Sequence, residues 1–405
     1  MVVNKQAAEA HGPSPGEMEE AVRIPLLAAA AVETVGPALH DSPACTVHRA
    51  RVAGSGFARA LALKRIKISN HVAFERFERE REVLRRCTHP CIVRPVFVVQ
   101  DAPCYGLVLP LADRGSLSDV LHRSGTASLP RALALCLCFD LASALEYIHA
   151  NLGLLHRDVK PANAVLEDTG RAVLIDFDRA CPIGEVPGQN RRRGPSGGRH
   201  KDYMVGTLVY MAPELLRRTM WGTASDIYSL AITINEVMTG CVPFSDVRQT
   251  CEELHTVLEA NYNELTLTSA ICSEGLRPNI VGPAAEDPGT AAAIARIQQA
   301  IQRGWSDEVG NRLSAEEMRL ALQQAAADAH ADASDAGARC KLLCQYDSLP
   351  SSVTVEQGDT RAMAGGTEGR ESGAGAGFCG KSSSLGLSEA AAAFRAAYPD
   401  VIGAR

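Results

Sequence analysis

Asp158, Lys160 and Asn163 are the residues of this chain whose types and spacing could most directly do chemistry. A carboxylate such as Asp158 can orient a hydroxyl group and accept its proton, and a lysine such as Lys160 can neutralise a phosphoryl group during transfer. The amide oxygen of Asn163 can hold Mg²⁺. This combination indicates phosphoryl transfer, provided that partner residues occur elsewhere in the chain.

Lys64, Glu80 and Asp176 are candidates for those partners. Lys64 lies in a strand-like run, and Glu80 lies in a charged segment whose apolar positions recur at helical spacing. A buried lysine tends to lose its charge, so a neighbouring carboxylate would both orient Lys64 and keep it protonated. Asp176 follows the apolar residues 173–175, which indicates a buried strand that ends in a carboxylate.

The elements that must position these residues change in character along the chain. Turn-forming glycines at 54 and 56 separate the first two strand-like runs, which predicts a hairpin. The expected strands are residues 46–50, 60–66, 91–99 and 105–109. The expected helices include residues 74–86, 133–149, 224–238 and 291–305. We therefore expect an α+β fold, in which a small β-rich lobe with one helix precedes a larger α-helical lobe.

Length and composition set broad limits on the class of protein. A chain of 405 residues with 46% hydrophobic residues can bury a large core, and its net charge of -6 gives no general attraction to nucleic acid or anionic lipid. Residues 24–32 are too short an apolar run to span a bilayer, so we expect no membrane insertion. The 13 cysteines are scattered, which favours reduced thiols. We expect a cytoplasmic protein.

Composition also divides the chain. Residues 1–32 suit a disordered or weakly ordered lead, because the first part is polar and contains Pro and Gly. Residues 325–405 are rich in Ala, Gly and Ser and should form a mostly disordered tail. The chemistry should therefore lie in residues 33–324.

Residues 33–324 resemble a eukaryotic protein kinase, with the family's motifs in order. The motifs that carry the resemblance are Leu61-Ala-Leu-Lys64, His156-Arg-Asp-Val-Lys-Pro-Ala-Asn163, Asp176-Phe-Asp178, Gly206-Thr207 and Ala212-Pro-Glu214. The resemblance implies a bilobal fold with an N-lobe at about residues 33–109 and a C-lobe at about 113–324. It also implies that ATP and Mg²⁺ are required.

The resemblance assigns roles to the candidate residues. Lys64 would bind the nucleotide's α- and β-phosphates and pair with Glu80. Asp158 would act as catalytic base beside Lys160 and Thr207. Asn163 and Asp176 would hold the metal.

Further family positions are implied to support the catalytic loop and the fold. Glu214 would form a buried pair with Arg312, and Asp226 would anchor the backbone of the catalytic loop. Phe177 would pack under the helix that carries Glu80. These residues are expected to be structural.

The resemblance also implies where adenine would bind. Leu109 aligns with the gatekeeper position, and the Pro110 carbonyl and the Ala112 N–H would meet the edge of the base. The apolar side chains expected to enclose the purine ring are those of Val47, Ala62 and Val165. Small apolar residues at such places are equally ordinary members of a core.

Two departures from the family pattern raise a second hypothesis. The family's glycine-rich phosphate loop would fall on residues 40–47, where His40, Ser42 and Cys45 replace the glycines. Asp178 replaces the glycine that normally follows Phe177, so we expect altered switching. Weakened nucleotide binding is the main expectation, and a pseudokinase that acts as a binding or scaffold module is the alternative.

Substrate class and regulation follow from the same resemblance. Lys160 and Thr207 go with Ser/Thr hydroxyl acceptors, so we expect protein substrates phosphorylated on Ser or Thr in intracellular signalling. Residues 115–117 and 276–278 are most similar to the tyrosine-kinase-like branch. Ser196, in the basic segment of residues 191–201, is a candidate autophosphorylation site, and Tyr203 is a candidate modification site; a solvated loop with no regulatory role explains the basic segment equally well. The same basic run could give access to the nucleus. A small-molecule kinase of related fold is a third reading, disfavoured by Thr207 and residues 212–214.

Overall fold

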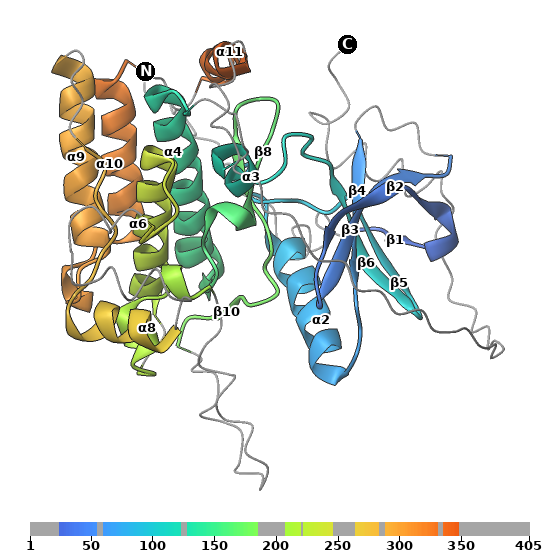
Figure 1. Cartoon of the computed structure of the whole chain (residues 1–405). Helices are drawn as coiled ribbons and strands as arrows, with labels where there is room; N and C mark the ends of the chain where they lie inside the picture. Colours follow the sequence, from blue (N-terminus) through green and yellow to red (C-terminus); the bar gives the residue numbers. More distant parts are fainter. Residues whose placement is uncertain are drawn as a thin grey trace, which may run out of the picture.

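The computed structural model describes most of the chain between residues 24 and 347. The described ranges are residues 24–54, 60–122, 128–184, 207–219, 222–245, 264–282, 288–330 and 335–347. They form two lobes, as expected from the sequence: a sheet with one long helix, followed by a helical lobe (Figure 1). Ser196 and Tyr203 lie outside the described residues, as do residues 348–405 of the predicted tail.

A six-stranded sheet builds the N-lobe, with the strand order β1-β5-β6-β4-β3-β2. Its strands are β1 (Leu26–Leu27), β2 (Val32–Asp41), β3 (Cys45–Val52), β4 (Leu61–Ile66), β5 (Phe97–Asp101) and β6 (Cys104–Pro110). β3 and β4 pair in antiparallel register, which confirms the predicted hairpin. This register sets Val47 opposite Lys64, so the start of β3 lies beside the candidate phosphate-binding lysine.

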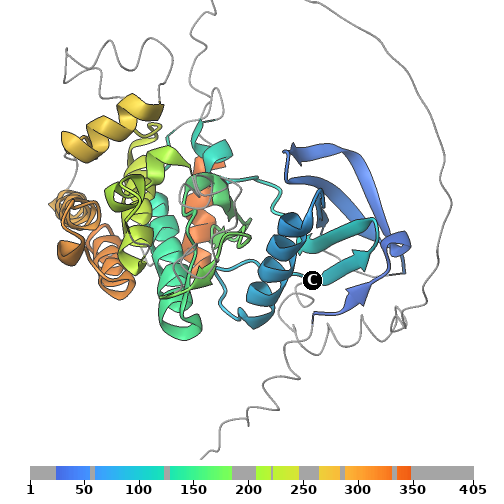
Figure 2. The same ribbon diagram turned by 90° about the horizontal axis from the view of Figure 1, so that it is seen from below.

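Helix α2 (His71–Arg86) carries Glu80. It begins where the side chain of Asn70 accepts the N–H of Ala73 at 2.9 Å, an N-cap that satisfies a free helix donor. Phe77 and Leu84 are buried and belong to the same apolar cluster as the C-lobe core. In both views α2 lies on the side of the sheet toward the C-lobe (Figure 1 and Figure 2), which brings Glu80 to the boundary between the lobes.

Helix α4 (Arg131–Tyr147) is the centre of the C-lobe. The other main C-lobe helices are α3 (Leu117–His122), α5 (Pro213–Leu216), α6 (Thr223–Thr239), α8 (Glu264–Ser273), α9 (Pro288–Gly304), α10 (Ala315–Asp328) and α11 (Ala336–Asp347). Residues Arg131–Leu152 are apolar and long enough to cross a membrane, but 67% of that stretch is buried, and its apolar side chains belong to the C-lobe core. Its apolar character is therefore that of a core helix.

Two short antiparallel strand pairs bring the catalytic segments together. β8 (Ala164–Leu166) pairs with β9 (Ala172–Leu174), and β7 (Leu154–Leu155) pairs with β10 (Cys181–Pro182). The catalytic-loop residues 156–163 therefore run from β7 to β8. Asp176 follows the end of β9, so the β7–β10 pair and the β8–β9 hairpin together position the candidate site.

Three boundaries differ from the sequence prediction. The sheet starts before residue 33, because Leu26 and Leu27 form β1. This strand pairs with the outer edge of β5. Residues 91–96 are not part of a strand; Pro95 lacks the N–H that a ladder needs. Helix α11 lies inside the segment that composition predicted as mostly disordered.

Glu214 and Arg312 form the expected buried pair. Nη1 and Nη2 of Arg312 donate to the Glu214 carboxylate, at 2.7 and 2.8 Å. The Arg312 side chain has no exposed surface. The guanidinium also lies 5.2 Å from the ring centroid of Tyr228. The pair joins the first turn of α5 to the segment before α10, which are far apart in the sequence.

We predict that Arg312→Met lowers the free energy of unfolding by about 3–5 kcal/mol, because Glu214 would remain as a buried charge without its partner. Arg303→Met is the matched control: Arg303 is 51% exposed and lies 3.9 Å from Glu317, so we expect a loss below about 1 kcal/mol. Urea denaturation of both variants measures the difference. Equal losses in the two variants would contradict the structural role of the pair.

Candidate active site

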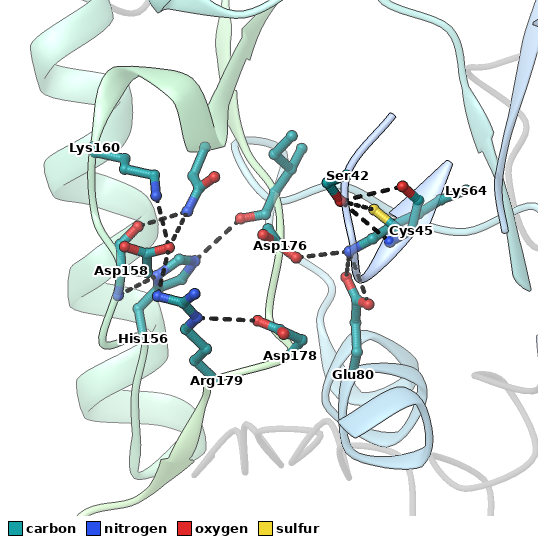
Figure 3. A network of polar contacts seen from close by, with 12 residues as sticks. Ser42, Cys45, Lys64, Glu80, His156, Asp158, Lys160, Asp176, Asp178 and Arg179 are labelled. Carbon is teal, nitrogen blue, oxygen red and sulfur yellow. Dashed lines mark hydrogen bonds and ion pairs between the residues drawn. The ribbon is translucent and has the colours of Figure 1, made fainter. Parts of the chain in front are cut away.

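Lys64 is the centre of a charged network between the two lobes (Figure 3). Its Nζ donates to both carboxylate oxygens of Glu80, at 2.7 and 2.9 Å, and to Oδ1 of Asp176 at 2.6 Å. β4 supplies the lysine, α2 supplies Glu80 and the segment after β9 supplies Asp176. The network therefore links the sheet, its helix and the C-lobe through one ammonium group.

Burial and charge act against each other in this network. Burial alone would lower the pKa of Lys64, but Glu80 and Asp176 together raise it well above its ordinary value. Burial raises the pKa of Glu80, and Lys64 only partly offsets this. Burial opposes the ionisation of Asp176 as well, yet Lys64 holds its pKa below the ordinary value. Lys64 is thus a charged lysine at neutral pH.

Asp226, on α6, holds the backbone at the start of the catalytic loop. Its carboxylate accepts the N–H of His156 at 2.8 Å and that of Arg157 at 2.9 Å, and His149 lies 2.9 Å from the same carboxylate. Arg157 has a φ of 70°, in the left-handed region that is costly for a residue with a side chain. The anchoring by Asp226 maintains this strained turn, as the sequence led us to expect.

Asp158, Lys160 and Thr207 form a second polar group. Lys160 Nζ donates to Oδ2 of Asp158 at 2.9 Å and to Oγ1 of Thr207 at 2.6 Å. The amide nitrogen of Asn163 donates to the same Asp158 oxygen at 3.0 Å and to the Asp158 backbone carbonyl at 2.8 Å. Asp158 is 6% exposed. A single buried carboxylate is therefore oriented by neighbours on both sides.

Asn163 and Asp176 fit a hard divalent cation. The nitrogen of the Asn163 amide is used by Asp158, so the oxygen is the end of the side chain that is left to bind a cation. An amide oxygen and a carboxylate are ligands that Mg²⁺ accepts, with water and phosphate oxygens completing the octahedron. Both residues adjoin the β8–β9 hairpin, since Asn163 directly precedes β8.

The residues expected around adenine come from both lobes. Ala62 on β4 lies opposite Leu109 on β6, and Pro110 ends that strand. Val165 is on β8 in the C-lobe, and Ala112 lies in the linker between the lobes. Ala62 is buried, and the side chains of Val47, Leu109, Pro110, Ala112 and Val165 are half-buried. Half-buried apolar side chains of this kind could cover a flat ring, and their binding role remains a prediction.

The turn between β2 and β3 occupies the place of the phosphate loop. Ser42 N–H donates to the Cys45 carbonyl at 3.0 Å, and Cys45 N–H donates to Oγ of Ser42 at 3.2 Å. Pro43 has no N–H to offer. Burial raises the pKa of the Cys45 thiol, which Lys64 lowers in part, so the thiol lies within electrostatic reach of the Lys64 network. Backbone donors that a glycine loop would direct at phosphate are used within this turn.

Comparison with known proteins identifies the family. Residues 47–319 match the protein kinase domain family. The chain belongs to the protein kinase family. The match starts at Val47, directly after the turn without glycines, and it ends before α11.

The relatives of this kinase are longer proteins. A protein kinase and PP2C-like domain-containing protein of Arabidopsis thaliana is 37% identical over 271 residues, which cover 65% of this chain and 40% of the relative. A protein of the same name in Oryza sativa subsp. japonica is 35% identical over 66% of this chain and 40% of the relative. Serine/threonine/tyrosine-protein kinase HT1 of Arabidopsis thaliana is 27% identical over 63% of this chain and 57% of the relative. The chain thus spans well under two thirds of each.

Asp178 and Arg179 distinguish this kinase from the family motif. Nη1 of Arg179 lies 3.3 Å from Oδ2 of Asp158, and its Nε lies 3.8 Å from Oδ1 of Asp178 (Figure 3). Burial, and then the charge of Asp176, raises the pKa of Asp178. The sequence analysis missed Arg179. It lies just after the motif, and nothing in the sequence indicates that its side chain approaches Asp158.

We predict that Ser42→Gly strengthens Mg²⁺–ATP binding by about threefold, the value of one ordinary hydrogen bond. The change removes the acceptor that occupies the Cys45 N–H and frees this donor for phosphate. Calorimetric titration with a non-hydrolysable ATP analogue measures the affinity.

Ser245→Gly is the control for this variant, because the Ser245 hydroxyl donates within a local turn, to the Val242 carbonyl at 2.7 Å. Its nucleotide affinity should equal that of the wild type. Weaker binding by Ser42→Gly than by this control would contradict the account of the turn.

Proposed function

We propose that this chain is an ATP- and Mg²⁺-dependent kinase that transfers the γ-phosphoryl group of ATP to Ser or Thr hydroxyls of proteins in intracellular signalling. The observation that carries the proposal is the position of Lys160. Its Nζ binds Asp158 Oδ2 and Thr207 Oγ1 at once, at 2.9 and 2.6 Å. A base, a cation and a hydroxyl from the substrate-facing segment thus converge on one point.

Each residue has a physical task in the proposed reaction. Asp158 accepts the proton as the substrate hydroxyl oxygen attacks the γ-phosphorus. The bond from phosphorus to the β,γ-bridging oxygen breaks, and its electron pair stays on ADP. Lys64 neutralises charge on the α- and β-phosphates, and Lys160 neutralises charge on the phosphoryl group in transfer.

Asn163 and Asp176 would hold the cation. The cation held there would supply positive charge that offsets part of the negative charge developing on the phosphates. Glu80 keeps Lys64 in place, at 2.7 Å. The geometry needs no further rearrangement of α2 to form this pair, which supports an active arrangement of the N-lobe.

Lys160 and Thr207 favour Ser/Thr acceptors, and the name of the relative HT1 includes serine and threonine. The name of HT1 includes tyrosine as well. Tyrosine phosphorylation is therefore an outcome that the experiment must separate.

A pseudokinase is the second candidate. The glycine-free turn, in which local hydrogen bonds occupy the N–H groups of Ser42 and Cys45, favours it. Asp178 also replaces the glycine that follows Phe177 in the family motif. Such a protein would bind partners or nucleotide without transferring phosphate.

We predict that the purified chain transfers radiolabel from γ-labelled ATP to a generic protein acceptor when Mg²⁺ is present. Asp158→Asn should lower the rate by about 10²–10⁴-fold, because the hydroxyl loses its proton acceptor. Asp328→Asn, a change on the surface of α10, should leave the rate unchanged. Analysis of the labelled amino acids should give phosphoserine or phosphothreonine.

The alternatives give different results. Label in the wild type no greater than in Asp158→Asn would remove the kinase proposal. If nucleotide still binds under those conditions, the pseudokinase remains. Phosphotyrosine alone would overturn the acceptor assignment while leaving phosphoryl transfer in place.

A further inference from the structure

Helix α11 packs against the kinase domain although it lies beyond residue 319, where the family match ends. Leu343 is 1% exposed, and Leu342 and Tyr346 pack against the C-lobe core. Figure 1 draws α11 at the top of the C-lobe, near α4 and the loop that ends β8. The described C-lobe thus includes an element that the family pattern does not supply.

A buried ion pair fixes α11 to α4. Arg339 donates to both carboxylate oxygens of Asp140, at 2.6 and 2.9 Å, and the two residues are 4% and 2% exposed. Burying two charges is costly unless their geometry is well matched. The two-point contact fixes the orientation of the guanidinium as well as its position, so it sets how α11 lies on the lobe.

Asp140 passes this contact on to the metal-site hairpin. Its carboxylate also accepts the backbone N–H of Ala172, the first residue of β9, at 2.9 Å. β9 pairs with β8 and leads to Asp176, while Asn163 directly precedes β8. One carboxylate therefore joins Arg339 to the hairpin that carries both expected metal ligands.

The turn of the same hairpin touches α11 directly. Gly170 has a φ of +75°, and a Cβ added there would lie 3.1 Å from the Arg339 backbone oxygen. Arg114, which follows the linker between the lobes, donates to both oxygens of Asp347 at 2.8 Å and to Asp168 in this turn at 3.1 Å. Both ends of α11 therefore contact segments that border the nucleotide site.

We propose that Arg339 is a positioning residue: through Asp140 it holds the β8–β9 hairpin, and with it Asn163 and Asp176, in the arrangement that binds the metal and nucleotide. The kinetic part of this proposal rests on the proposed function. Its structural part, the coupling of α11 to the hairpin, does not. A helix that merely covered apolar surface would stabilise the lobe without changing the metal site.

The test uses the full chain with Arg339→Met, Arg339→Lys and Arg296→Met. Arg296 pairs with Asp328 on the surface, at 3.0 Å and with 43% of its side chain exposed, and serves as the control. Hydrogen exchange is followed in residues 164–176, 315–328 and 336–347. Calorimetry gives the affinity for Mg²⁺–ADP, and kinetics separate KM for ATP from KM for the protein acceptor.

Arg339→Met should speed exchange in both residues 336–347 and residues 164–176, and leave residues 315–328 unchanged. It should weaken Mg²⁺–ADP binding by about tenfold, a typical size for coupling between two sites. KM for ATP should rise while KM for the acceptor stays constant. Arg339→Lys should recover only part of the loss, because an ammonium group cannot reproduce the two-point contact. Arg296→Met should match the wild type.

Faster exchange confined to residues 336–347, with unchanged Mg²⁺–ADP affinity, would overturn the proposal. If Arg339→Met does not fold, Leu343→Ala replaces it, since this change loosens α11 and leaves both charges in place; the same two regions must respond. If the wild type transfers no phosphate, but Arg339→Met still speeds exchange in both regions, only the proposed function is contradicted. If the wild type binds no Mg²⁺–ADP, the exchange rate of residues 164–176 in Arg339→Met tests the coupling: a rate equal to that of the wild type would overturn the proposal.

Discussion

The ammonium group of Lys64 is the contact on which the candidate site depends. It binds Glu80 and Asp176 within 2.9 Å, and these carboxylates come from different lobes. The buried Glu80 could not stay ionised at low cost without the lysine, and the lysine could not stay charged at low cost without the two carboxylates. The ion pairs of Lys64 therefore fix the relative position of α2, the sheet and the segment after β9.

The rest of the C-lobe maintains the strained backbone that this balance requires. Asp176 has a φ of 67° and Arg157 a φ of 70°, conformations that need outside support. Asp226 supplies it for Arg157 through two backbone N–H groups, and Lys64 holds the Asp176 side chain. The fully buried Phe177 follows Asp176, and its ring centroid lies 4.8 Å from that of His156 in a T-shaped arrangement. Core packing and polar anchoring thus act on the same few residues.

The sequence could predict the bilobal fold, the pairing of Lys64 with Glu80 and the anchoring by Asp226, because each depends on a motif with fixed spacing. It could not predict the docking of α11, since an Ala-rich composition does not reveal that Arg339 would meet a buried Asp140 almost 200 residues away. The local hydrogen bonds of Ser42 and the approach of Arg179 to Asp158 were also hidden, because both depend on side-chain directions. The boundary at residue 33 was set too late because two apolar residues are too few to show a periodic pattern.

The claim that Lys64 and its carboxylates form a phosphate and metal site is tested most directly by comparing ligands that differ only in phosphate. Calorimetry would give the affinities of adenosine and ADP, with and without Mg²⁺, for the wild type and for Lys64→Met. The account predicts that the wild type binds ADP more tightly than adenosine when Mg²⁺ is present, and that Lys64→Met loses this preference. Equal affinity for the two ligands in the wild type would contradict it.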